Sequence, residues 1–284
     1  MQIIDWRICS DCTDFCNYCF ASEKFPSISL EQEKIIIDKI IHSNIRVVNI
    51  SGGEPMIDTE RCFRIMDILR QHGKKVYLST NGYQVSSHLL RIKNTVSLLG
   101  LPLDGPDEVS NMVCGRSRES FRRIESILKD PIAEKIKIKI GTVITRKNLS
   151  YQTLKGLAEF MDCNPVNIWR IYEMLPENRA IQNRRNLELT PEELNELTQI
   201  TQKIAKKEHH WHLELVTRQM RNANYMIIRP DGSVIIPIDM GIRVDEVVLG
   251  NLIDLSFQEL IQKWKVIAEK RTNILYARQR FSDI

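Results

Sequence analysis

A group of three cysteines constrains this chain more than any other feature. Cys12, Cys16 and Cys19 follow a C-x3-C-x2-C spacing directly after a short apolar run. The spacers are so short that one loop can bring three thiolates around a single metal cluster. A [4Fe–4S] cluster has four irons, so three thiolates leave one iron open. We therefore predict that these cysteines are metal ligands and that the open iron is a place for chemistry.

Cysteine usage and charge narrow the setting. The chain has seven cysteines, four of them within residues 9–19, and no cysteine follows Cys163. The clustered cysteines favour metal binding in a reducing compartment over disulfide formation. Because no cysteine follows Cys163, we expect no second cysteine-ligated cluster in the last part of the chain. Met1 leads into a strand-like run rather than an export signal, and no apolar stretch reaches ~18 residues. We predict a cytoplasmic protein without a membrane span, and a net charge of +4 predicts no nucleic-acid partner.

Strand and helix patterns alternate along the first part of the chain. Strands are predicted over 3–8, 47–50, 75–79, 96–103, 135–144 and 167–172, with helices at 29–41, 59–71, 89–92, 117–128 and 154–161. Six such units predict an α/β fold, a partial (β/α)6 TIM-like barrel over residues 1–175. A helix at 190–207, a strand at 211–216, a hairpin over 225–237 and a helix at 256–270 predict a C-terminal α+β cap over residues 176–284, which we expect to set substrate specificity.

Polar motifs follow several of these predicted strands. They are Gly52-Gly53-Glu54, Thr80-Asn81-Gly82, Asp104-Gly105, and Arg146 with Asn148. In barrel folds the functional groups lie at the C-terminal ends of the strands. The sequence therefore predicts that these motifs share one rim with the cysteine loop.

The combined motifs resemble the radical S-adenosylmethionine (SAM) superfamily over residues 3 to about 175. Tyr18 before Cys19, Gly-Gly-Glu after the second strand, and Gly115 with Arg116 carry this resemblance. It implies a [4Fe–4S] cluster on Cys12, Cys16 and Cys19, with SAM on the open iron. It also implies a set of SAM-binding residues: Tyr18 beside the cluster ligands, Glu54 for the SAM ammonium, Arg116 for the carboxylate, Ser79 and Asn81 for the ribose, Val143 for the adenine, and Gly52 with Gly53, whose backbone would approach the methionine moiety.

The resemblance further implies an activity. Such an enzyme cleaves SAM reductively to a 5′-deoxyadenosyl radical and abstracts a hydrogen atom from a small organic substrate. Its electrons would come from a low-potential donor such as flavodoxin or ferredoxin. The C-terminal part resembles that of peptide- and sugar-modifying members, yet Ile236 to Met240 stand where a cysteine is expected. An auxiliary cluster is therefore not expected.

Three alternatives stay open. Residues 49–55, 107–116 and 164–170 resemble viperin-like nucleotide (CTP) dehydratases, so the substrate could be a nucleotide or another anion. A peptide-modifying enzyme that matures ribosomally made peptides is the second alternative. A non-catalytic Fe–S or zinc protein is the third, with Cys9 as a fourth zinc ligand.

Other reactive or basic residues have plainer interpretations. Cys62 and Cys163 are expected to be structural, and Cys114 is a weak candidate for a hydrogen-atom donor to substrate. Six basic residues are expected on a solvated face, with binding of an anionic substrate as the alternative: Arg179, Arg184, Arg185, Arg218, Arg221 and Arg229.

Overall fold

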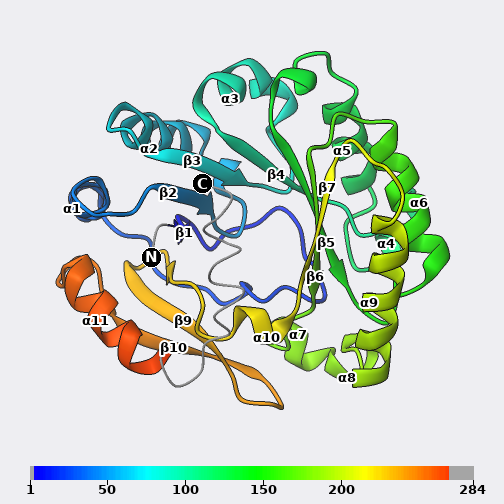
Figure 1. Cartoon of the computed structure of the whole chain (residues 1–284). Coiled ribbons are helices and arrows are strands. Elements are labelled where there is room, and N and C mark those ends of the chain that lie inside the picture. Colours follow the sequence, from blue (N-terminus) through cyan, green and yellow to red (C-terminus); the bar gives the residue numbers. More distant parts are fainter. Residues whose placement is uncertain (1–2, 269–284) are drawn as a thin grey trace. The chain divides into compact units, whose positions relative to one another are not determined.

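The computed structural model describes residues 3–268 (Figure 1). The chain divides into two compact units. Unit 1 comprises residues 3–12, 21–79 and 218–268, and unit 2 comprises residues 13–20 and 80–217. Each unit has its own run of parallel strands with helices between them.

Unit 1 is built on three parallel strands. They are β1 (Ile3–Arg7), β2 (Val47–Ser51) and β3 (Lys75–Ser79), and β1 and β2 pair from Ile3↔Val47 to Arg7↔Ser51. Two helices connect them, α1 (Leu30–Ile41) and α2 (Thr59–Gln71), with the short 3-10 helix η1 (Pro55–Ile57) before α2. The apolar stripe of α1, Ile36, Ile37 and Ile40, is buried, and α2 packs on β3. Both predicted helices and all three strands are confirmed.

The C-terminal elements of unit 1 extend the same sheet. They are α10 (Arg218–Arg221), β8 (Ile227–Ile228), β9 (Ser233–Asp239), β10 (Val244–Asn251) and α11 (Phe257–Ala268). The order of strands in this unit is β10-β9-β8-β1-β2-β3, with β8 parallel to β1 and both β9 contacts antiparallel. The hairpin predicted around Gly232 is confirmed, while β10 was not predicted. The final helix was predicted to reach residue 270, and residues 269–270 lie outside the described part.

Unit 2 holds four parallel strands. In sheet order they are β4 (Leu98–Pro102), β5 (Ile138–Ile144), β6 (Ile168–Glu173) and β7 (His212–Val216). The helices are η2 (Ser86–His88), α3 (Leu89–Thr95), α4 (Glu108–Val113), α5 (Ser120–Leu128), η3 (Ala133–Lys135), α6 (Tyr151–Asp162), α7 (Arg179–Gln182), α8 (Arg184–Leu187) and α9 (Pro191–Ala205).

Two strands of the predicted cap pair in parallel with strands of the predicted barrel. β7 pairs in parallel with β6, from Ile168↔His212 to Tyr172↔Val216, and α9 packs on α6 and β7. β8 pairs with β1 through Asp5↔Ile227 and Trp6↔Ile228. The region after residue 175 therefore supplies strands to both units, and the domain boundary at 175/176 stays a prediction.

Local signals explain where helices begin. Ser29 and Gln32 form a capping box on α1, and Thr190 and Glu193 form one on α9, each satisfying two backbone donors that have no intrahelical partner. Within residues 3–268, every helix is too short or too polar to span a bilayer.

Candidate cofactor site

The segment Gly52-Gly53-Glu54, which follows β2, packs directly against residues 9–11 at the start of the cysteine loop in unit 1. We call Gly52 and Gly53 the glycine seat. The Gly53 N–H donates to Cys9 O at 2.9 Å, and the Glu54 N–H donates to Asp11 O at 2.6 Å. A Cβ on Gly53 would lie 2.1 Å from Asp11 O, and one on Gly52 would lie 2.7 Å from Cys9 O. Residues 9–11 can pack this closely only because both positions are glycine. The family resemblance predicts that the two glycines allow close approach of SAM. Their close packing against residues 9–11 is a second structural reason why both positions need glycine.

Glu54 and Ser79 lie in ordered polar surroundings in unit 1. The Glu54 side chain is fully buried, and its Oε1 accepts the Met56 N–H at 2.9 Å, which caps η1. Ser79 Oγ donates to Asn49 Oδ1 at 2.9 Å, and the Asn49 amide donates to Asp5. Both predicted SAM contacts therefore come from side chains whose positions are fixed by neighbours.

Cys9, which the zinc alternative would use as a fourth ligand, is hydrogen-bonded to the segment after β2 in unit 1. Its thiol donates to Glu54 O at 3.3 Å, and burial is the main cause that raises its pKa to about 11. Cys12, by contrast, is exposed. In unit 1, the Cys12 thiol is therefore accessible, whereas the Cys9 thiol, which is outside the motif, is hydrogen-bonded within the fold.

Cys16 and Cys19 share one turn in unit 2. The Cys19 N–H donates to Cys16 O at 3.2 Å, and both side chains are partly exposed. Cys16 packs against the apolar cluster of Tyr18, Met174, Ala180 and Leu187. Within residues 3–268, no three His, Cys, Asp or Glu side chains converge on a single ion, and cluster ligands need not, because each binds a different iron. The donor set of Cys12, Cys16 and Cys19 fits a cluster that keeps one iron open.

Asp104 is the polar centre of unit 2, a role that the sequence did not predict. It is fully buried after β4, and its Oδ2 accepts the Arg116 Nε–H at 2.7 Å together with the hydroxyl of Tyr18. Its Oδ1 accepts the Val143 N–H at 2.7 Å. Burial raises the pKa of Tyr18 well above its usual range, so the phenol stays a neutral donor. The signal in the sequence was an acidic residue at a strand end, within Leu103-Asp104-Gly105.

Arg116 remains charged inside this network. Burial opposes its charge, yet Asp104 more than offsets burial and the pKa of Arg116 is well above its usual range. Its NH1 donates to Cys16 Sγ at 3.6 Å. A guanidinium has five N–H donors, so these two contacts leave others for a ligand carboxylate. The preceding Gly115 has φ 97° and faces Asn17, where a Cβ would lie 3.2 Å from the backbone nitrogen.

The remaining predicted site residues of unit 2 are held by local hydrogen bonds. Asn81 donates to Thr13 Oγ1 at 2.8 Å and accepts the Tyr83 N–H at 3.0 Å. Cys114 is buried, and its thiol donates to Ser110 O at 3.2 Å, a structural placement that gives the hydrogen-donor alternative no support. Cys62 in unit 1 is fully buried on α2, as predicted.

The prediction of a solvated basic face is wrong for three arginines of unit 1. Arg218, Arg221 and Arg229 are each less than a tenth exposed. Arg229 pairs with Glu246 and stacks on the Phe25 ring at 4.4 Å from its centroid, and Arg218 pairs with Asp239 at 2.5 Å. Carboxylates on β9 and β10 neutralise the guanidiniums of Arg218 and Arg229, which allows these two charges to be buried.

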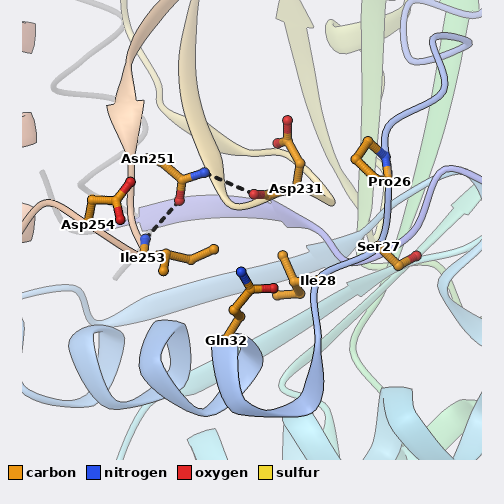
Figure 2. Close-up of a pocket in the computed structure, with 8 residues that line it drawn as sticks. All are labelled: Pro26, Ser27, Ile28, Gln32, Asp231, Asn251, Ile253 and Asp254. Carbon is orange, nitrogen blue, oxygen red and sulfur yellow. Dashed lines mark hydrogen bonds between the residues drawn. The ribbon is translucent and has the colours of Figure 1, made fainter.

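A cavity of about 250 Å³ lies in unit 1, and no predicted site residue is among those that line it. Figure 2 shows its lining, with Asn251 bridging Asp231 and Ile253 by hydrogen bonds of 3.0 and 2.8 Å. Its walls come from residues 26–28 before α1, from Gln32 in α1, and from the chain just before β9 and at the end of β10, which lie at the same end of this antiparallel pair. It contains no cysteine, histidine or basic group and carries no candidate chemistry.

Comparison with known proteins decides the family. The model of the radical SAM superfamily matches residues 6–161, which is more than half of the chain and includes all three motif cysteines. The chain belongs to the radical SAM superfamily. The cofactors predicted from the sequence, a [4Fe–4S] cluster and SAM, are those of this superfamily.

Relatives within the superfamily have different functions. A SAM-dependent nucleotide dehydratase of Psychrobacter lutiphocae is 25% identical over 61% of this chain and 65% of its own length. The mycofactocin maturase MftC of Mycolicibacterium smegmatis is 28% identical over 51% of this chain and 38% of its own length. The chain thus spans less than two thirds of these relatives.

Solved structures confirm the fold class. SuiB of Streptococcus suis bound to SAM matches 95% of this chain and 67% of its own chain, with a TM-score of 0.71 and 16% identity. The anSMEcpe enzyme with bound AdoMet and a peptide matches 94% of this chain and 82% of its own, with a TM-score of 0.68 and 17% identity. The superfamily fold of this chain is mixed α/β with a mostly parallel sheet, the partial TIM-like barrel predicted from the sequence.

Proposed function

We propose that this chain is a radical SAM enzyme that abstracts a hydrogen atom from a small organic substrate. The observation that carries the proposal is the C-x3-C-x2-C loop in a chain of this superfamily. Three ligands leave one iron open for SAM. When bound, the cluster and SAM together supply a 5′-deoxyadenosyl radical by reductive cleavage of SAM.

The chain's own residues hold and orient these groups. Cys12, Cys16 and Cys19 ligate three irons as thiolates, and the seat at Gly52 and Gly53 holds the loop that carries them. Asp104 fixes Tyr18, Arg116 and the backbone of Val143 in one network, so its role is to position them.

The contacts to SAM within this proposal are those that the resemblance to the superfamily implies. Glu54 pairs with the ammonium, and Arg116 uses its remaining N–H donors for the carboxylate. Ser79 and Asn81 bind the ribose hydroxyls, and Val143 flanks the adenine. Tyr18, whose hydroxyl is committed to Asp104, contributes through its main chain.

A nucleotide is the favoured substrate class within this proposal. Two nucleotide dehydratases each align with 61% of this chain, and a GTP 3′,8-cyclase of Synechococcus elongatus aligns with 58% at 24% identity. A peptide substrate is the second candidate, supported by the maturases among the relatives. Residues 176–284 set the choice, a low-potential flavodoxin or ferredoxin supplies electrons, and the protein works in the cytoplasm.

One experiment tests the substrate class. Anaerobically reconstituted protein is incubated with SAM, dithionite and each of a panel of ribose-deuterated nucleoside triphosphates, followed by mass spectrometry of 5′-deoxyadenosine. Deuterium from one nucleotide supports the proposal. Cleavage of SAM without label transfer from any nucleotide contradicts the nucleotide class, whereas absence of cleavage by protein with a full cluster contradicts the radical SAM function itself.

A further inference from the structure

The segment that follows β6 reaches the cysteine loop through three side chains of unit 2. Asn178 Nδ2 donates to Phe20 O at 2.6 Å, and Asn183 Nδ2 donates to Asn17 O at 3.0 Å. Arg179 NH1 donates to Cys16 O at 3.2 Å. We call Asn178, Arg179 and Asn183 the clamp. Its three partners are backbone carbonyls along residues 16–20, the part of the loop that carries two of the three cysteines.

Two further features show that the clamp is specifically shaped. The Arg179 guanidinium stacks on the ring of Phe15 at 3.4 Å from its centroid, a favourable cation–π contact. Asn178 has φ 52°, a backbone conformation that costs free energy and persists only where surrounding contacts hold it. The sequence suggested a solvated basic loop, but such a loop would require neither the cation–π contact of Arg179 nor the positive φ of Asn178.

Cys16 consequently lies beside two guanidiniums. Arg116 NH1 donates to its sulfur at 3.6 Å, and Arg179 NH1 donates to its carbonyl oxygen. Net charge and hydrogen bonds to the sulfur ligands set the reduction potential of an iron–sulfur cluster. Reduction adds one negative charge, so neighbouring positive charge favours the reduced state.

We propose that the clamp has two roles toward the cluster, and this proposal rests on the proposed function. Asn178 and Asn183 hold the loop backbone in the form that retains iron. Arg179 shares that task and, together with Arg116, raises the reduction potential at Cys16. The three are positioning residues, since none of them supplies a cluster ligand.

The test uses reconstituted full-length protein and two measurements. One is the rate of iron loss to the chelator bathophenanthroline under anaerobic conditions, and the other is the midpoint potential from an EPR-monitored redox titration. Asn183→Ala should lose iron about two- to tenfold faster, the effect of one hydrogen bond, with an unchanged potential. Arg179→Gln should lose iron faster and also lower the potential, with a change of about tenfold in the reduction equilibrium, which is ~59 mV for a one-electron couple.

Two variants serve as matched comparisons. Arg184→Gln removes the same charge from the same segment, but Arg184 pairs with Glu188 instead of the loop, so iron retention and potential should stay at wild-type values. Arg179→Lys keeps the charge and should restore the potential.

Specific outcomes would overturn the clamp. It is wrong if Asn183→Ala retains iron like the wild type, or if Arg179→Gln has the same potential as Arg184→Gln. Should Arg179→Gln hold no cluster at all, a lowered potential in Arg179→Lys would overturn the electrostatic role. A wild-type protein that takes up no cluster contradicts the proposed function instead, so the two failures are distinguishable.

Discussion

At the scale of single residues, close approach and buried charge decide which side chains the site tolerates. Gly53 and Asp104 illustrate the two cases. Gly53 leaves no room for a methyl group against Asp11, and Asp104 is a fully buried carboxylate that compensates the charge of Arg116. Neither residue needs to touch a cofactor to be required for the site.

Gly53→Ala should destabilise the protein and impair cluster binding. The new methyl group would meet backbone atoms of Asp11, which cannot move aside as a flexible side chain would. Overpacking of this kind costs about 1–3 kcal/mol. Urea unfolding and iron content after reconstitution measure the two effects.

Gly141→Ala is the matched control for Gly53→Ala. Its Cβ would come closest to the edge of the Tyr172 ring, at 3.3 Å, and that ring can shift, while Leu101 O would lie at an ordinary contact distance of 3.9 Å. We expect a stability change below about 1 kcal/mol. Equal losses in the two alanine variants would contradict the account of the glycine seat.

Asp104→Asn should be far more damaging than Tyr18→Phe. The first change leaves the buried Arg116 without its carboxylate, and loss of one member of a buried ion pair costs about 3–5 kcal/mol. The second removes one hydroxyl donor to a charged acceptor, a loss of about 1.5–3 kcal/mol. Chemical denaturation of both variants tests this order, and a Tyr18→Phe loss as large as that of Asp104→Asn would refute it.

At the scale of elements, side chains far apart in sequence join the C-terminal strands to β1 in unit 1. Glu246 on β10 binds Arg7 of β1 at 3.1 Å and also binds Arg229 after β8. The three side chains are nearly inaccessible, so one carboxylate serves two buried guanidiniums. β10 therefore also supplies the carboxylate that neutralises Arg7 and Arg229.

Glu246→Gln should strongly destabilise the protein, by about 3–5 kcal/mol, because both guanidiniums lose their shared counter-charge. The neighbouring Asp245→Asn is the control. Asp245 pairs with Arg243, whose side chain is 60% exposed, and such surface pairs are worth about 0–1 kcal/mol. Thermal unfolding of the two variants should separate them clearly, and indistinguishable melting temperatures would count against a structural role for Glu246.

Sequence patterns predicted the positions of helices and strands better than they predicted which strands pair with one another. Capping residues and apolar periodicity located α1, α2, α9 and the strands, since these signals are local. They assigned β7 to a cap, because pairing with β6 depends on residues some forty positions away. β10 was missed because acidic and glycine residues interrupt its apolar pattern.

The same limit applies to the site. Cys12, Cys16 and Cys19 were predictable because ligand spacing is a local signal. The contacts of Asn178 and Asn183 with loop carbonyls were not, because amide-to-backbone hydrogen bonds leave no pattern in sequence. The need for glycine at positions 52 and 53 to avoid a clash with residues 9–11 also could not be predicted, because it depends on where those residues lie in the fold.

At the scale of the whole molecule, the account requires a single cluster. The described cysteines outside the motif are Cys9, Cys62, Cys114 and Cys163, and the first three have thiols that are bonded to carbonyls or fully buried. Anaerobic reconstitution should therefore give about four irons per chain. A content near eight irons would reveal a second cluster that this account lacks.

The most direct test of the central claim is SAM cleavage by cysteine variants under anaerobic conditions with dithionite. Wild-type protein and Cys163→Ala, which alters an exposed cysteine outside the motif, should both form 5′-deoxyadenosine. Cys16→Ala should lose cleavage because one iron loses its thiolate. Full cleavage activity and iron content in Cys16→Ala would contradict the assignment of this loop as the cluster site.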